Sequence, residues 1–285
     1  MSKSNSDPEW TIEIKPVSGW FNLHLKDVWT YRDLLFMFVR RDFVAVYKQT
    51  ILGPSWFFLQ PILTTITFTI VFGNIAKIPT DNVPPVLFYM AGIVCWGYFA
   101  DCLTRTSSTF VSNAHIFGKV YFPRLVSPLS NVISLLIKFG IQMLLLIGFI
   151  IYYKLNGALV DPNIYILLTP FLIFLMAGLG LGFGIIVSSL TTKYRDLSFL
   201  VGFGVQLLMY ATPVIYPLSA APEKYKWIIL LNPMTAIIDT FKYAYLGAGE
   251  FNAGNLIYST VFMVVIIAIG IVIFNRIEKT FMDTV

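Results

Sequence analysis

The chain has 285 residues, of which 57% are hydrophobic, 16% aromatic and only 12% charged. Soluble domains are about 45–50% apolar and about 25% charged, so the composition excludes an ordinary soluble enzyme or binding domain of this length. The net charge of +5 includes no basic cluster denser than Arg40-Arg41, which favours lipid head-group contact and argues against nucleic-acid binding.

The N-terminal part is polar and precedes every long apolar run. Residues 1–18 contain two prolines and predict a flexible cytoplasmic segment, and residues 19–54 predict a cytoplasmic interfacial helix region. Within that region the spacing places five apolar residues near one helix face: Leu25, Val28, Trp29, Leu35 and Phe36. The first apolar run begins near residue 49, which is too late for a cleavable secretory signal.

The apolar residues gather into runs long enough to cross a membrane. A helix needs about 20 mostly apolar residues to cross a hydrocarbon core of about 30 Å. We therefore expect an all-α membrane protein in which residues 55–285 form a transmembrane domain. Its six expected spans are 56–76, 84–104, 129–153, 164–190, 197–215 and 256–275.

Basic residues are distributed unevenly among the connections. Of the 20 Lys and Arg residues, 14 lie on the side of the expected membrane that holds both termini. The positive-inside rule therefore predicts cytoplasmic termini. Asp101 and Lys138 fall inside expected spans, where charges mark an ion pathway, reach an interface or pair locally.

Two connections are unusual in composition. The coupling loop, residues 105–128, mixes aromatic and polar residues and predicts a short helix docked on another surface. The segment 213–254 contains four prolines, and its apolar stretch is interrupted at Asn232-Pro233. Because that stretch is too short to cross a bilayer, the segment predicts a re-entrant pair of short helices on the outer side.

Motifs for common catalytic chemistry are missing. The sequence has no G-x-x-x-x-G-K-[ST] loop for ATP, no D-x-D, no H-E-x-x-H and no G-x-S-x-G. Cys95 and Cys102 are spaced too far apart on a helix for a mutual disulfide, and with two histidines no Cys/His zinc site is expected. We expect no catalytic residue, cofactor or metal in this chain. The glycines at 178, 180, 182 and 184 predict close helix packing.

Two expected spans carry aromatic and hydrogen-bonding side chains along one face. The first stripe comprises Phe58, Thr65, Phe68 and Phe72, and the second comprises Phe199, Phe203, Gln206 and Tyr210. Aromatic planes with interspersed polar groups suit a sliding sugar chain, because the apolar faces of sugar rings stack on aromatic rings. The alternative is that these phenylalanines pack against lipid or neighbouring helices.

Several segments together resemble the permease subunit of type-2 ABC exporters, and more narrowly the branch that exports O-antigen, capsule or teichoic-acid polysaccharides. The resemblance covers nearly the whole chain from about residue 25. It is carried by Arg41-Asp42, Tyr47-Lys48-Gln49-Thr50-Ile51-Leu52-Gly53-Pro54-Ser55-Trp56, Gln60-Pro61, Lys119-Val-Tyr-Phe-Pro-Arg124, Tyr194-Arg-Asp196, Pro213-Val-Ile-Tyr-Pro217, Leu231-Asn-Pro-Met234 and Glu278-Lys-Thr-Phe281.

This resemblance implies a homodimer in the bacterial inner membrane, bound to two separate ABC ATPase subunits that hold ATP and Mg. It also implies that a lipid-linked polysaccharide passes between the two permeases, along the first and fifth spans. The implied ATPase-coupling residues are Asn113, Ile116, Phe117, Lys119, Tyr121, Phe122, Pro123 and Arg124. The implied interfacial or gating residues are Arg40, Arg41, Asp42, Tyr47, Tyr194, Arg195 and Asp196. The implied outer gate comprises Pro213, Tyr216, Pro217, Asn232, Pro233 and Met234.

Two other functions compete with polysaccharide export. A type-2 ABC permease for a small hydrophobic drug or lipid would share the fold, and a smooth apolar path would favour it. A membrane enzyme acting on lipid-linked sugars is disfavoured, because the outward loops contain no close pair of carboxylates.

Overall fold

The computed structural model of the chain describes residues 25–48, 51–117, 122–191 and 196–280, and all regular structure within them is helical. The α-helices are α1 (Leu25–Thr30), α2 (Arg32–Tyr47), α3 (Trp56–Phe68), α4 (Pro85–Ser107), α5 (Thr109–Phe117), α6 (Val126–Leu155), α7 (Thr169–Thr191), α8 (Leu197–Tyr210), α9 (Glu223–Leu231), α10 (Pro233–Leu246) and α11 (Ala253–Thr280). The shorter segments are the 3₁₀ helices η1 (Gly53–Ser55), η3 (Ile164–Leu168) and η4 (Leu218–Ala220), and the π-helix η2 (Thr69–Ile75).

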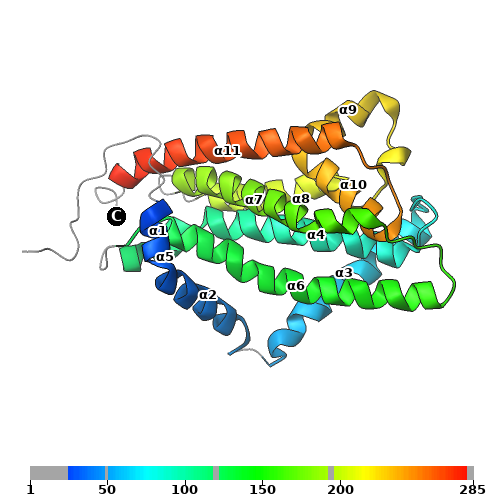
Figure 1. Cartoon of the computed structure of the whole chain (residues 1–285), viewed down its shortest axis with the longest axis horizontal. Helices are drawn as coiled ribbons and strands as arrows, with labels where there is room; N and C mark the ends of the chain where they lie inside the picture. The colour runs from blue at the N-terminus through cyan, green and yellow to red at the C-terminus, as the bar shows by residue number, and fades with distance from the viewer. Residues whose placement is uncertain (1–24, 49–50, 118–121, 192–195, 281–285) are drawn as a thin grey trace, which may run out of the picture.

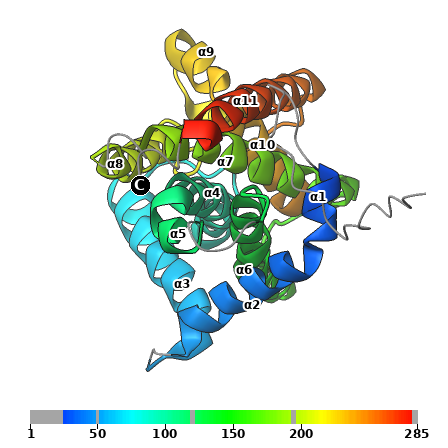
Figure 2. The same cartoon turned by 90° about the vertical axis from the view of Figure 1, so that its left-hand side faces the viewer.

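The long helices form an elongated bundle. Helices α4, α6, α7 and α11 run along its length, with α1 and α5 at one end and α9 and α10 at the other (Figure 1). Seen down the bundle, α4 lies at the centre and its neighbours surround it (Figure 2). Most side chains of α4 are buried, so this helix forms the core on which the others pack.

Helix α7 packs closely on two neighbours because glycines line it. A Cβ atom on Gly180 would lie 2.5 Å from Cβ of Cys102 in α4, and one on Gly184 would collide with Thr106. A Cβ on Gly178 or Gly182 would collide instead with side chains of α11. The predicted role of these glycines in close helix packing is therefore confirmed.

Five helical segments are long and apolar enough to cross a membrane: Gly53–Ile75, Pro85–Ser107, Val126–Leu155, Ile164–Thr191 and Ala253–Arg276. They match five of the six expected spans. The expected span at 197–215 is represented by α8, which ends at Tyr210 after 14 residues and is followed by a turn. The third span begins at Val126, earlier than the expected residue 129.

The first span is not uniformly α-helical. Helix α3 ends at Phe68, and the chain continues as the π-helix η2 from Thr69 to Ile75. Hydrophobicity alone does not distinguish the two helix types, so the sequence analysis missed this change.

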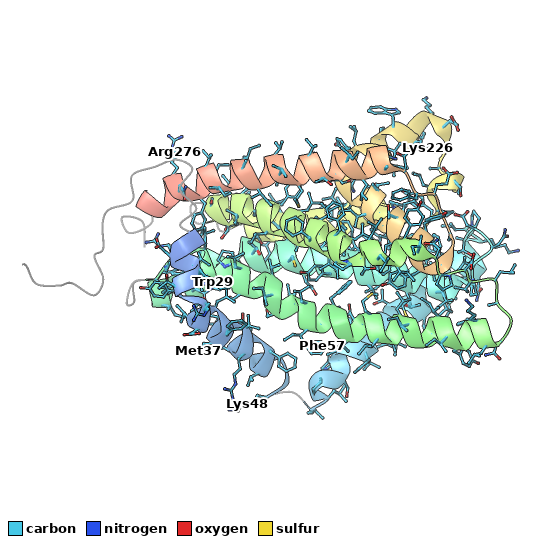
Figure 3. The ribbon with its side chains drawn as sticks, viewed as in Figure 1. Trp29, Met37, Lys48, Phe57, Lys226 and Arg276 are labelled. Atoms are coloured by element: carbon cyan, nitrogen blue, oxygen red, sulfur yellow. The ribbon has the colours of Figure 1, made fainter. Side chains whose placement is uncertain are left out.

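The N-terminal helices differ from the single amphipathic face that was expected. A break at Tyr31 separates α1 from α2, and only Val28 and Leu35 of the expected face are buried. Trp29 and Phe36 are exposed, because adjacent residues on a helix point about 100° apart. Of the expected face, Val28 and Leu35 therefore pack on the bundle, whereas Trp29 and Phe36 lie on its surface, where Figure 3 labels Trp29.

Helices α9 and α10 meet at Asn232-Pro233, as the sequence predicted. Asn232 caps α10, and its side chain accepts a hydrogen bond from the Met234 backbone N–H at 3.0 Å. This α10 end of the bundle carries Lys226, whereas Arg276 lies toward the α5 end (Figure 3). These two basic residues therefore lie at opposite ends of the bundle, and the expected topology places them on opposite sides of the membrane.

Candidate functional site

The first aromatic stripe is only partly exposed. Phe58 is exposed and Phe72 is half-buried, but Thr65 and Phe68 are buried against the rest of the chain. The Phe68 ring contacts the Phe72 ring with centroids 5.2 Å apart and the Tyr89 ring of α4 at 6.2 Å. Thr65 and Phe68 therefore face the packed interior of the chain, not its surface.

The second aromatic stripe lies on the surface of α8. Phe199, Phe203, Gln206 and Tyr210 are all exposed, and Val205 is the only buried residue of this helix. Helices α3 and α8 lie on the same flank of the bundle (Figure 2). A single chain therefore presents an aromatic surface along this flank that includes the exposed amide of Gln206.

A turn of six residues, 211–216, follows α8, and we call it the exit turn. The implied gate residues Pro213, Pro217, Pro233 and Met234 are buried here, and Tyr216 and Asn232 are half-buried. The Asn232 side chain donates a hydrogen bond from Nδ2 to Thr212 Oγ1 at 2.8 Å. The structure thus brings together the two halves of the implied outer gate, which are separated in sequence by 14 residues, 218–231.

Lys242 of α10 also contacts the exit turn, and the sequence analysis did not select it. Its Nζ donates hydrogen bonds to the carbonyl oxygens of Pro213 at 2.7 Å and Val214 at 3.2 Å. The same nitrogen lies 3.3 Å from the centroid of the Phe88 ring in α4. One usable signal was present: Asp239 and Lys242 are one helical turn apart in an otherwise apolar stretch.

Burial governs the electrostatics of this pair. It lowers the pKa of the Lys242 amine, and the neighbouring Asp239 carboxylate opposes that change. Burial also raises the pKa of Asp239, opposed by Lys242 and by a hydrogen bond from the Glu250 backbone N–H. The two charges therefore support each other's ionised state inside the α10 end.

The implied coupling residues contribute to an aromatic cluster near the α5 end, made of Phe38, Phe110, Phe117, Phe122 and Phe274. Ring centroids are 5.7 Å apart for Phe38–Phe122, 5.5 Å for Phe117–Phe122 and 5.3 Å for Phe110–Phe274. All five rings are buried. The apolar side chains that were expected to need a partner's surface are thus covered by α2, α6 and α11 of the same chain.

The side chain of Asn113 joins α5 to α6 beside this aromatic cluster. The buried Asn113 side chain donates to the Thr109 carbonyl at 3.0 Å and to Ser127 Oγ at 3.1 Å. Ile116, Pro123 and Arg124 are half-buried around it. The expected short helix in the coupling loop is present, and it docks on its own chain.

One of the implied interfacial residues, Arg41, contacts the aromatic cluster. Arg40 and Arg41 are exposed, and Arg41 pairs with Asp42 at 2.8 Å while its guanidinium lies 4.6 Å from the Phe38 ring centroid. Asp196 is exposed just before α8, and Tyr47 is the last residue of α2. Four implied residues lie outside the described part of the chain: Lys119, Tyr121, Tyr194 and Arg195.

The two charges inside expected spans form an ion pair. Lys138 Nζ of α6 lies 2.7 Å from Asp101 Oδ2 of α4 and donates a second hydrogen bond to Gln60 Oε1 of α3 at 3.4 Å. Of the alternatives left open by the sequence, local pairing is the one observed.

Cys95 and Cys102 are both buried and free, as expected for packing residues. Within the described residues, no group of three or more His, Cys, Asp or Glu side chains could hold a metal ion.

The sequence is similar to one protein family and to several known transport proteins. The sequence model of the family described as "ABC-2 type transporter" matches residues 33–246. An O-antigen export system permease protein of Klebsiella pneumoniae is 29% identical over 252 residues, which cover 88% of this chain and 94% of that protein. One of Myxococcus xanthus is 26% identical over 76% of this chain and 82% of its own length. A polysialic acid transport protein of Escherichia coli is 22% identical over 82% of this chain and 89% of its own length.

Proposed function

The chain belongs to the ABC-2 type transporter family, and from this membership we propose that it is the membrane permease of an ATP-driven exporter of lipid-linked polysaccharide. The proposal is carried by the similarity to O-antigen export permeases over 88% of the chain. The aromatic surface of α8, with its exposed Gln206, favours a sugar chain as the substrate and disfavours a small hydrophobic drug. The chain is a multi-pass protein of the bacterial inner membrane.

We further propose that two copies assemble with their α3 and α8 flanks facing each other. Helix α8 is only about 21 Å long at 1.5 Å per residue, which is shorter than a hydrocarbon core of about 30 Å. The sixth membrane crossing would therefore include the exit turn as well as α8. An unpaired amide exposed to hydrocarbon costs several kcal/mol, which favours placing Gln206 toward a partner or a polar path. The path would then follow Phe58, Phe199, Phe203, Gln206 and Tyr210.

Two ABC ATPase subunits, which would bind ATP and Mg, are proposed to dock on α5. Its exposed face offers Val111 and Ser112, whereas its apolar face is already covered by the aromatic cluster. Because that cluster joins α5 to α2 and α6, a movement of α5 would be passed to both helices. Nucleotide binding in the partner ATPase would thereby shift α2, the interfacial helix, and open the path between the two permeases. Both termini of each permease would stay on the cytoplasmic side.

We expect the purified permease alone to hydrolyse no ATP, because its sequence lacks a phosphate-binding loop. Addition of its partner ABC ATPase should give vanadate-sensitive hydrolysis. In inverted membrane vesicles, the pair should also move lipid-linked glycan into the lumen, where an added glycan-cleaving enzyme cannot reach it. Hydrolysis by permease freed of every contaminating ATPase would contradict the partner arrangement. ATP-driven transport of a small hydrophobic drug, without glycan movement, would support the competing function.

The path on α8 can be tested with single cysteines in a background lacking Cys95 and Cys102. Phe203→Cys and Tyr210→Cys should react with a membrane-impermeant thiol reagent during ATP hydrolysis, because both lie on the proposed polar path. Leu208 is the control, because it lies on the opposite side of the helix from both positions. Exposed fractions are 61% for Phe203, 48% for Tyr210 and 44% for Leu208. Equal labelling of Leu208→Cys and the two path positions during verified export would place the path elsewhere.

A further inference from the structure

The side chain of Lys242 is only 2% exposed, although lysine side chains are rarely buried. Burying an ammonium group is costly unless hydrogen bonds or an opposite charge replace its water shell. Here the replacement comes from two backbone carbonyls of the exit turn and the face of the Phe88 ring. The lysine therefore joins α10 to the exit turn, with α4 on its other side.

Three further contacts hold the exit turn. Thr212 is fully buried and accepts the hydrogen bond from Asn232 while donating to the Leu208 carbonyl at 2.6 Å. Gly92 of α4 lets the Val214 backbone approach, since a Cβ at Gly92 would lie 2.9 Å from the Val214 oxygen. Residues from α4 and α10 thus fix this turn from two directions.

The remainder of α8 is held weakly in comparison. Val205 is its only buried residue, and its other side chains are exposed or half-buried. The position of α8 relative to the bundle therefore depends strongly on the exit turn. The α10 helix is itself fixed to α11, because Ser259 Oγ donates to the Pro233 carbonyl at 2.7 Å.

We propose that Lys242 is a positioning residue for transport, which fixes the exit turn to α10 so that the end of α8 and the α9–α10 pair move as one unit. A lysine suits this role because its ammonium can donate to two adjacent carbonyls and to a ring face at once. Because this role concerns transport, it rests on the proposed function.

The test uses Lys242→Met, which keeps a long unbranched side chain and removes the charge and the donors. Hydrogen–deuterium exchange of the assembled permease–ATPase complex should become about tenfold faster in residues 206–217, because the turn loses charged hydrogen bonds. Export per assembled complex should fall about tenfold, while ATP hydrolysis persists. Lys242→Arg should restore part of both, since a guanidinium can also donate to two carbonyls.

A matched control separates this role from a general loss of charge. Lys226→Met, on the neighbouring helix α9 at a half-buried site, should leave exchange and export at parental values. Parental exchange in residues 206–217 of Lys242→Met would overturn the positioning role. The positioning role would also be overturned if export fell only in proportion to the amount of assembled complex.

Thr212→Val decides the question if Lys242→Met fails to assemble. It removes the acceptor of Asn232 from the same turn without removing a charge. Faster exchange in residues 206–217 with lower export per complex supports the role, and parental values of both overturn it. If the parental complex moves no polysaccharide, the proposed function fails, whereas the exchange data still report whether Lys242 holds the turn.

Discussion

Replacing Asp101 by Asn is expected to lower the free energy of unfolding of the permease by about 1–3 kcal/mol, because it removes the charged partner of the half-buried Lys138 ammonium. The two groups lie 2.7 Å apart, and their side chains are mostly enclosed. Lys138→Met should have a similar effect, since it leaves the Asp101 carboxylate uncompensated. Denaturation of the detergent-solubilised protein measures both.

The double variant Asp101→Asn/Lys138→Met distinguishes pairing from two independent effects. If the charges stabilise each other, the double variant should lose less than the sum of the single variants, with a coupling energy of about 1–3 kcal/mol. Lys154→Met, exposed in the last turn of α6, is the control and should stay close to the parent. Additive losses would show that the short distance contributes no net stability.

Alanine at Gly180 and Gly184 together is expected to destabilise the bundle by several kcal/mol, because overpacking costs about 1–3 kcal/mol per site. The Gly180 Cβ would lie 3.2 Å from backbone atoms of α4, and the Gly184 Cβ would lie 3.1 Å from the Leu103 carbonyl oxygen. Backbone atoms cannot give way as a flexible side chain does. Helices α4 and α7 would have to separate.

The matched control is Gly140→Ala/Gly148→Ala in α6, where a new Cβ meets no atom within 4 Å. Alanine is preferred to glycine in a helix by about 1 kcal/mol, so this pair should be neutral or stabilising. In thermal unfolding in detergent, the melting temperature of the Gly180/Gly184 double variant should therefore fall, whereas that of the Gly140/Gly148 double variant should stay at or above the parental value. A similar melting temperature for the two would mean that α4 and α7 tolerate a wider separation.

The sequence was sufficient to predict the helical class, five spans and the break at Asn232-Pro233. Those features depend on local properties, namely the length of apolar runs and the missing N–H of proline. The glycine spacing also predicted the close packing of α7, because only small residues allow that approach.

The sequence was insufficient where the result depends on which helices become neighbours. An apolar face does not reveal its partner, so Phe117 and Phe122 were assigned to another protein's surface although α2 covers them. For the same reason Thr65 and Phe68 were placed on an open path. Lys242 was not selected, since nothing in its local sequence shows that two distant carbonyl oxygens will accept its hydrogen bonds.

The π-helix η2 divides the first span into two parts with different registers. In a π-helix the backbone hydrogen bonds reach one residue further than in an α-helix, so each turn holds about one residue more. A helical wheel drawn from Phe58 therefore holds only as far as Phe68. Residues from 69 to 75 have a different angular position, and Phe72 cannot be assigned to the same stripe by counting.

This change of register also has a consequence for length. Removing one residue from the segment 69–75 could convert it toward α-helix without altering the orientation of α3 against α4. We therefore see η2 as the place where this span can gain or lose a residue while both of its ends keep their neighbours. The angle between aromatic side chains before and after η2 is therefore set by this change of register and by their contacts with the core.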